Sequence, residues 1–176
     1  MKMGYFKIFL AFLISINLGY AQAPTDRPYL ENPKFDAHVS GLINFSVPVI
    51  SVEELNQNNS DYMIFDTREE EEYMVSHIEG AKYLGYNDFD SSRLENIPKD
   101  AKIVLYCSVG YRSEKIGEKL STLGFSNVYN LYGSIFEWVN HGYKIVDIFG
   151  LETQKVHTYN KKWGKWLDEP KAKKVW

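Results

Sequence analysis

Apolar stretches that are typical of buried strands alternate with amphipathic stretches along most of the chain. The strand-like runs occupy residues 47–50, 62–66, 80–86, 102–106 and 128–131. The run at 102–106 is almost continuously apolar, as in the central strand of a parallel sheet that is covered on both faces. Strands that alternate with helices in this way predict an α/β fold with helices on both sides of a parallel sheet.

Helical patterns separate these strands, and their ends carry the expected signals. We predict helices at 52–55, 69–76, 113–123 and 135–140, and a helical or turn-like segment at 88–96. Ser51 is placed to cap the first of them, and Gly124 follows the third, where a glycine commonly ends a helix. Residues 24–46 contain three prolines and show no period, so we predict an irregular lead-in there.

Residues 1–23 have the three-part layout of a secretory signal peptide. Two lysines precede an apolar core at 8–18, and small residues follow at Ala21 and Ala23, where a signal peptidase would cleave. The core is shorter than the roughly 20 apolar residues of a membrane span. We therefore expect an exported protein, periplasmic or secreted. An uncleaved segment that anchors the chain in a membrane is the alternative.

The composition narrows the class of protein further. The chain has 176 residues and a formal net charge of -3, so it lacks the basic surface of a protein that coats nucleic acid. Hydrophobic residues make up 44%, which is enough for a packed core. A single cysteine excludes an intramolecular disulfide and a zinc site built from several cysteines, and we expect no metal and no cofactor.

The C-terminal segment 149–176 forms a basic tail that is rich in tryptophan. It holds seven lysines against three acidic residues, whereas residues 24–148 carry a net charge of -9. Trp163, Trp166 and Leu167 lie at helical spacing, which predicts a short amphipathic helix. We expect the tail to fold back onto the acidic body because the two charges are opposite. Contact with a protein partner or a membrane surface is the alternative.

Cys107 follows the strand-like run 102–106, at the edge where open α/β sheets place their ligands. A short loop and the start of a helix come next, so backbone N–H groups and the helix dipole point at the sulfur. Arg112 adds a positive charge, and together these groups should lower the pKa of the thiol. Gly110 lets the loop turn tightly, and Ser113 is expected to cap the next helix. We therefore predict a reactive thiolate rather than an inert buried thiol.

The segment Cys107–Ser113 fits the pattern C-x-x-G-x-R-S and resembles the active-site loop of rhodanese-type sulfurtransferases. Two further blocks resemble the same family in order and spacing: residues 65–81, with D-x-R-x-x-x-E-Y and H-I-x-G-A, and residues 125–143. The resemblance implies a rhodanese-like three-layer fold, in which a five-stranded parallel sheet is flanked by helices. It places this fold in a single domain at 47–148.

The resemblance also implies a reaction. The Cys107 thiolate would attack the outer sulfur of a small donor such as thiosulfate and become a persulfide, and a thiol or cyanide acceptor would then remove that sulfur. The residues that would cradle the sulfur and bind the donor are Ser108, Val109, Gly110, Tyr111, Arg112 and Ser113. Efficient users of thiosulfate tend to have more positive loops than this one, which weakens the case for thiosulfate as the natural donor.

Four polar residues upstream are interpreted as structural support for the site. Asp66 ends a strand beside the expected cleft, where a carboxylate more often caps backbone N–H groups or pairs with a basic neighbour than acts as a base. Arg68 and Glu72 are four residues apart, which predicts an ion pair between them. His77 is expected to be a buried hydrogen-bonding residue rather than a catalyst or a metal ligand.

Two alternatives to a sulfurtransferase remain open. One is a binding module that uses the same fold without catalysis and contacts a partner through its basic tail. The other is a phosphatase or arsenate reductase of this fold, whose catalytic loop has one residue more between cysteine and arginine. The shorter loop between Cys107 and Arg112 suits a sulfur atom better than a phosphoryl group.

Overall fold

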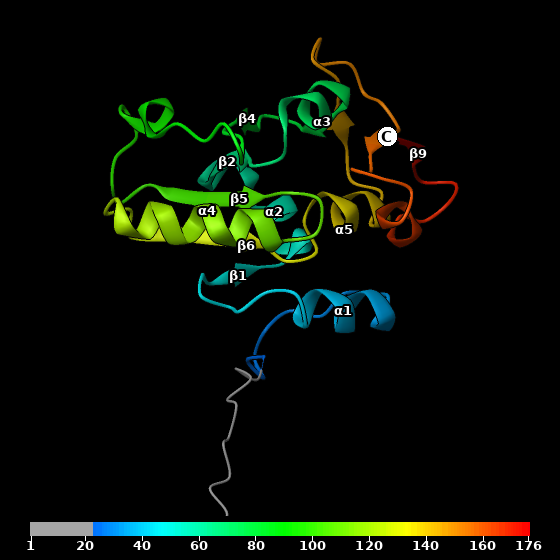
Figure 1. The fold of residues 1–176 in the computed structure, drawn as a ribbon, viewed down its shortest axis with the longest axis horizontal. Coiled ribbons are helices and arrows are strands. Elements are labelled where there is room, and N and C mark those ends of the chain that lie inside the picture. Colours follow the sequence, from blue (N-terminus) through cyan, green and yellow to red (C-terminus); the bar gives the residue numbers. More distant parts are fainter. Residues whose placement is uncertain (1–22) are drawn as a thin grey trace, which may run out of the picture.

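The computed structural model describes residues 23–176, and its centre is a five-stranded parallel sheet (Figure 1). The strand order is β1-β6-β5-β2-β4, and every neighbouring pair runs parallel. The strands span Val49–Ile50 (β1), Met63–Asp66 (β2), Lys82–Tyr83 (β4), Lys102–Tyr106 (β5) and Asn127–Leu131 (β6). The predicted α/β fold with a five-stranded parallel sheet is therefore confirmed.

Helices and two small sheets complete the described chain. The α-helices are α1 (Pro33–Ser40), α2 (Val52–Gln57), α3 (Glu70–Val75), α4 (Tyr111–Thr122) and α5 (Ser134–Asn140). Short 3₁₀ segments lie at Asn59–Asp61, Ser91–Leu94 and Trp163–Trp166. In the small sheets, β3 (His77–Ile78) pairs antiparallel with β7 (Ile145–Val146), and β8 (Lys155–His157) pairs parallel with β9 (Lys173–Val175).

Both faces of the main sheet are buried by helices (Figure 1). Side chains alternate along β5, so Ile103 and Leu105 join one apolar cluster together with side chains of α4. Val104 and Tyr106 join the opposite cluster, which holds side chains of α1, α2 and α5. The nearly continuous apolar sequence of this strand follows from its central position, because both of its faces are covered.

The lead-in at 24–46 is not irregular throughout, contrary to the prediction, because it contains α1. Asn32 caps this helix by accepting two backbone N–H groups of the first turn, at 3.0 and 3.2 Å, and Pro33 follows it. Phe35 and Val39 lie one turn apart and are fully buried in the core. The helix has only eight residues, so its apolar period is too short to stand out among the prolines.

The predicted signal peptide at 1–23 lies almost wholly outside the described residues, so its cleavage stays a prediction. In the part of the chain that the structure describes, none of the helices is long and apolar enough to cross a membrane. The described chain is tied to the body from its start: Arg27 forms an ion pair with Asp36 at 2.6 Å and donates to the Tyr132 hydroxyl at 2.7 Å.

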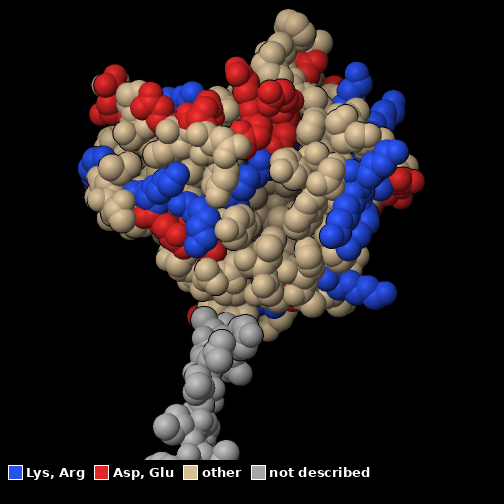
Figure 2. All heavy atoms as spheres, viewed as in Figure 1, with Lys and Arg blue, Asp and Glu red and all other residues tan. Residues whose placement is uncertain are grey.

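The C-terminal tail folds back onto the body, as expected, but apolar contacts rather than ion pairs hold it there. Val156 and Leu167 are buried in the core, and the Trp166 ring stacks on Phe35 and His38 of α1, with centroids 5.2 and 5.1 Å apart. Lysines stand out on the surface in the region of the tail, at the right of Figure 2. Among the described residues, no ion pair joins a tail lysine to the body. The predicted helix is a single 3₁₀ turn.

Candidate active site

Cys107 follows β5 directly and lies in a tight loop that leads into α4. The loop turns at Gly110, whose φ of 122° is in a region that residues with a Cβ rarely adopt. This turn aims the Gly110 N–H at the sulfur, with 3.1 Å between N and Sγ. The helix begins at Tyr111, so Gly110 takes the N-cap position and Ser113 lies inside the helix. The predicted cap by Ser113 is therefore wrong.

Two residues that the sequence analysis did not assign to the site hold this loop in shape. The Asn130 side chain, fully buried on β6, donates to the Gly110 carbonyl at 2.9 Å and accepts from the Ser113 hydroxyl at 2.7 Å. The Ser134 hydroxyl, at the start of α5, accepts the backbone N–H of Cys107 at 3.2 Å. The sequence signal for Asn130 was an amide between the apolar side chains of Tyr129 and Leu131, since a buried amide needs hydrogen-bond partners.

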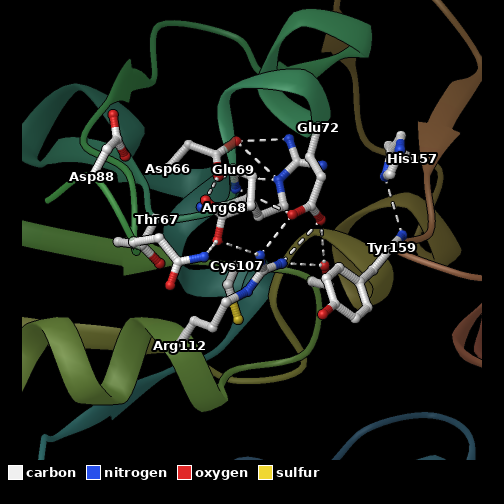
Figure 3. A network of polar contacts seen from close by, with 12 residues as sticks. Asp66, Thr67, Arg68, Glu69, Glu72, Asp88, Cys107, Arg112, His157 and Tyr159 are labelled. Atoms are coloured by element: carbon white, nitrogen blue, oxygen red, sulfur yellow. Dashed lines mark hydrogen bonds and ion pairs between the residues drawn. The ribbon is translucent and has the colours of Figure 1, made fainter. Parts of the chain in front are cut away.

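Arg112 lies on the first turn of α4 and is bound by a carboxylate from α3 (Figure 3). Its guanidinium donates to both oxygens of Glu72, at 2.6 and 2.9 Å, and to the Ser108 hydroxyl at 3.0 Å. Glu69 is a second carboxylate, 3.6 Å away. Burial raises the pKa of Glu72, but the hydrogen bonds and charge of Arg112 outweigh burial and hold this pKa below its usual value.

The Cys107 thiol is almost completely buried, with 1% of the residue exposed. Burial by itself raises the pKa of the thiol, because it disfavours the charged thiolate. The positive charge of Arg112 and hydrogen bonds from Ser113 and Gly110 outweigh burial, so the pKa of Cys107 lies below its usual value. The geometry therefore favours a thiolate, in agreement with the prediction from the loop sequence.

The predicted ion pair between Arg68 and Glu72 is absent, because both residues have other partners. Arg68 forms a fully buried pair with Asp66 at 2.6 Å and donates to the Ser76 carbonyl at 2.6 Å. Asp66 also accepts the backbone N–H of Arg68 at 2.9 Å. Since α3 begins only at Glu70, Arg68 and Glu72 do not face each other across a helical turn. Asp66 has the supporting contacts that the sequence analysis favoured over a role as general base.

His77 has a structural environment as well. Its buried ring stacks on Tyr73, with centroids 4.0 Å apart, and Nδ1 lies 3.2 Å from the Tyr73 carbonyl oxygen. Within the described part of the chain, no group of three or more His, Cys, Asp or Glu side chains is arranged to hold a metal ion. The contacts of His77 are thus those of a packed side chain beside α3.

A cavity of about 350 Å³ lies over Cys107. The loop contributes Cys107, Ser108 and Val109 to its lining, and the first turn of α4 contributes Tyr111 and Arg112. Four other segments contribute the rest, which are Leu42, Glu69, Tyr86, Asn87, Tyr159 and Trp163. The predicted supporting residues Asp66, Arg68, Glu72 and His77 lie outside this lining, and so do the predicted cradle residues Gly110 and Ser113. The sequence gives no periodic signal for side chains from such distant segments, so they were not predicted.

Replacing Arg112 should raise the pKa of Cys107, because its charge is the main group that opposes the effect of burial. In Arg112→Gln we expect the midpoint of the pH profile for alkylation by iodoacetamide to rise by about 1 unit or more. The wild type should titrate below about 8.5. Lys115→Gln is the control, since Lys115 pairs with Glu118 at 2.6 Å on the surface. A wild-type midpoint at or above about 8.5, or equal shifts in both variants, would contradict the expectation.

Glu72→Gln should destabilise the protein at neutral pH and much less in acid. The fold lowers the pKa of Glu72 below its usual 4.5. The ionised carboxylate therefore stabilises the folded protein at pH values above 4.5, and this stabilisation is lost as the pH falls through the pKa that Glu72 has in the folded protein. At pH 7 the variant leaves Arg112 with only the more distant carboxylate of Glu69, at 3.6 Å, which costs about 3 kcal/mol in the free energy of unfolding. Urea unfolding at neutral and acid pH measures the difference, with the exposed Glu71→Gln as control. If Glu72→Gln lowers the free energy of unfolding by the same amount at neutral and at acid pH, Glu72 does not stabilise the fold through its charge.

Comparison with known proteins places the chain among rhodanese-like domains. The rhodanese-like domain of a protein from Anabaena sp., solved in solution by NMR, superposes with a TM-score of 0.54 at 22% identity. The match covers 57% of this chain and 80% of that one, and it shows a shared fold. A protein of Bacillus halodurans gives the same TM-score and identity, over 59% of this chain and 80% of that one.

Relatives with curated names match the same region. The tRNA uridine(34) hydroxylase of Photorhabdus laumondii is 34% identical over 100 residues, which are 51% of this chain and 27% of that protein. The tRNA uridine(34) hydroxylase of Escherichia coli is 29% identical over 116 residues, which are 62% of this chain and 31% of that protein. The chain thus spans about a third or less of the length of these relatives. The model of the rhodanese-like domain family matches residues 51–141, more than half of the chain, so the chain belongs to this family.

Proposed function

We propose that this protein is a sulfurtransferase that carries sulfane sulfur as a persulfide on Cys107. The observation that carries the proposal is the environment of the sulfur. Sγ accepts the N–H of Gly110 at 3.1 Å, and Arg112 lowers the pKa of the thiol against the effect of burial. The groups that stabilise a thiolate at this position would equally stabilise the anion of a persulfide, and membership of the rhodanese-like family supports this chemistry.

In the first half-reaction, the Cys107 thiolate attacks the outer, sulfane sulfur of a donor. A new S–S bond forms between Sγ and that sulfur, and the bond that held the sulfur in the donor breaks. The leaving group departs with the electron pair of the broken bond, as sulfite from thiosulfate or as a thiolate from an organic persulfide or polysulfide. From mercaptopyruvate the bond that breaks is C–S, and the enolate of pyruvate leaves and takes up a proton. The product on the protein is a persulfide anion beside the Gly110 N–H.

In the second half-reaction, a cyanide ion or a thiolate attacks the outer sulfur of the persulfide. The bond between this sulfur and Sγ breaks, and Cys107 leaves as the thiolate that began the cycle. The step needs no electron source and no cofactor, because sulfur moves in the same oxidation state from donor to acceptor. The lowered pKa of Cys107 makes it a better leaving group, so the same electrostatics serve both half-reactions.

The hydroxylation of tRNA that the relatives' names describe is not proposed for this chain. The chain spans only 27% and 31% of the two relatives above, and residues 24–148 carry a net charge of -9, which disfavours binding of an RNA backbone. A phosphatase or arsenate reductase is disfavoured by the short loop and because Arg112 is already paired with Glu72 at 2.6 Å. A binding module without chemistry would have no use for a thiol whose pKa is lowered.

Intact mass of the purified protein tests the proposal directly. After incubation with a donor from the set thiosulfate, mercaptopyruvate and polysulfide, the wild type should gain the mass of one sulfur atom, and cyanide or dithiothreitol should remove it. Cys107→Ser should gain nothing under the same conditions. If none of the three donors adds mass to the wild type, the enzyme proposal fails, and a binding module becomes the better explanation.

We also propose that the protein is exported, on the basis of the layout of residues 1–23. After expression of the full chain in a bacterial host, N-terminal sequencing should find a new terminus after Ala21 or Ala23 in protein from the periplasm or the medium. Leu13→Arg places a charge in the apolar core and should leave the chain uncleaved in the cytoplasm. Wild-type protein that stays in the cytoplasm with an intact N-terminus would contradict export.

A further inference from the structure

The cavity over Cys107 is larger than a small inorganic donor needs. Its volume of about 350 Å³ lies within the range of pockets that take organic ligands. Thiosulfate and cyanide are far smaller, so either would leave much of the space to water. The cavity therefore has room for a reactant that carries an organic group next to its reacting sulfur.

Apolar and aromatic side chains form most of the cavity wall. They come from the lead-in, the loop after β4, the loop after Cys107, the first turn of α4 and the tail, and they are Leu42, Tyr86, Val109, Tyr111, Tyr159 and Trp163. Three of them, Leu42, Tyr159 and Trp163, lie outside the family match at 51–141. Segments outside the family match therefore shape the space in front of the reactive sulfur.

Tyr159 is held beside the site by the backbone of the tail (Figure 3). Its φ is 62°, and its N–H donates to Nδ1 of His157 at 3.1 Å. The preceding Thr158 is fully buried and donates its N–H to the Val175 carbonyl on β9 at 2.8 Å. The Tyr159 ring lies 5.5 Å from the guanidinium carbon of Arg112, yet 58% of the residue stays exposed. The exposed part of this ring is available to a flat ligand.

The charge around the cavity does not favour a dianion. Among the described lining residues, the charged side chains are Glu69 and Arg112. Arg112 is already paired with Glu72 at 2.6 Å and has Glu69 at 3.6 Å, so the local charge is negative rather than positive. Thiosulfate carries two negative charges and would find no unpaired cation in this lining.

We propose that the cavity selects sulfur donors that carry an aromatic group on the part that leaves when the S–S bond of the donor breaks, and that Tyr159 sets this preference by stacking on that group. The inference rests on the proposed function, because it names the substrate class of the same sulfur. Aromatic pairs gain from offset stacking in addition to the burial of apolar area. Since Cys107, Tyr86 and Tyr159 line the same cavity, a donor that presents its sulfur to Sγ can place its aromatic ring against the two tyrosine rings.

Two thiosulfonate anions provide a matched pair of donors. Benzenethiosulfonate and methanethiosulfonate carry the same charge and the same reacting group and differ in the aromatic ring. In each, the Cys107 thiolate takes the sulfane sulfur, the S–S bond of the donor breaks, and a sulfinate leaves with the electron pair. Cyanide then removes the sulfur as thiocyanate, whose formation gives kcat/KM for each donor. We expect the wild type to prefer the aromatic donor at least about tenfold, and to use thiosulfate less well than either.

Variants at Tyr159 test whether this residue causes the preference. Tyr159→Asn removes the ring and keeps a residue type that tolerates the positive φ; the ratio of the two kcat/KM values should fall to within about threefold of unity. Tyr159→Phe keeps the ring and should keep the ratio. Trp176→Ala removes an exposed aromatic residue of the same tail that does not line the cavity, and it should also keep the ratio. If Tyr159→Asn fails to fold, Tyr86→Ala takes its place as the test: it removes an aromatic ring from another part of the cavity lining and should also lower the ratio.

The outcomes separate the two proposals. If Cys107 gains a sulfur but the wild type does not prefer the aromatic donor, the sulfurtransferase stands and the aromatic selection is wrong. The same conclusion follows if Tyr159→Asn folds and keeps the wild-type ratio. If neither thiosulfonate yields thiocyanate while another donor adds sulfur to Cys107, the aromatic selection is again wrong and the sulfurtransferase stands. If Cys107 gains no mass from the thiosulfonates or from thiosulfate, mercaptopyruvate and polysulfide, the proposed function fails and the inference fails with it.

Discussion

The ion pair between Arg112 and Glu72 is the contact on which the rest of the site depends. Arg112 lies in the first turn of α4, where the helix dipole disfavours a cation, and Glu72 offsets this with bonds of 2.6 and 2.9 Å. The same contact fixes the position of the positive charge that lowers the pKa of Cys107. The acidity of the sulfur therefore depends on a residue 40 positions before Arg112, on a different helix.

The sheet and the reactive loop could be predicted because both follow from local patterns. Each of the five predicted strand runs overlaps a strand of the main sheet, since burial on both faces imposes an apolar sequence on a parallel strand. The position of Cys107 follows from the order strand, loop, helix, which brings the carboxyl end of β5 and the N-terminus of α4 to one point. In the same way, Gly110 was identified because a tight turn needs its conformational freedom.

Contacts between distant segments could not be predicted in this way. The spacing of Arg68 and Glu72 indicated a pair only on the assumption that both lie in one helix, and α3 begins too late for that. The sequence around Asn130 shows a buried amide but does not reveal that its partners are Gly110 and Ser113. For the tail, opposite charge predicted the docking correctly, yet the observed contacts are stacking of Trp166 on α1 and hydrogen bonds to the Asn140 side chain of α5. Each of these partners is set by the fold and not by neighbouring positions in the chain.

The site divides into a part that sets the chemistry and a part that sets what reaches it. Persulfide chemistry makes demands on a few groups near Sγ, which here are the Gly110 N–H and the charge of Arg112, and both belong to the segment that the family model covers. The reaction does not depend on which residues line the outer part of the cavity, so proteins that share the loop can differ in these residues. Family membership thus constrains the bond that breaks but not the group attached to it. The lead-in and the tail form the walls on which the proposed choice of that group depends, and the stack of Trp166 on α1 holds these two segments together although it lies outside the cavity lining.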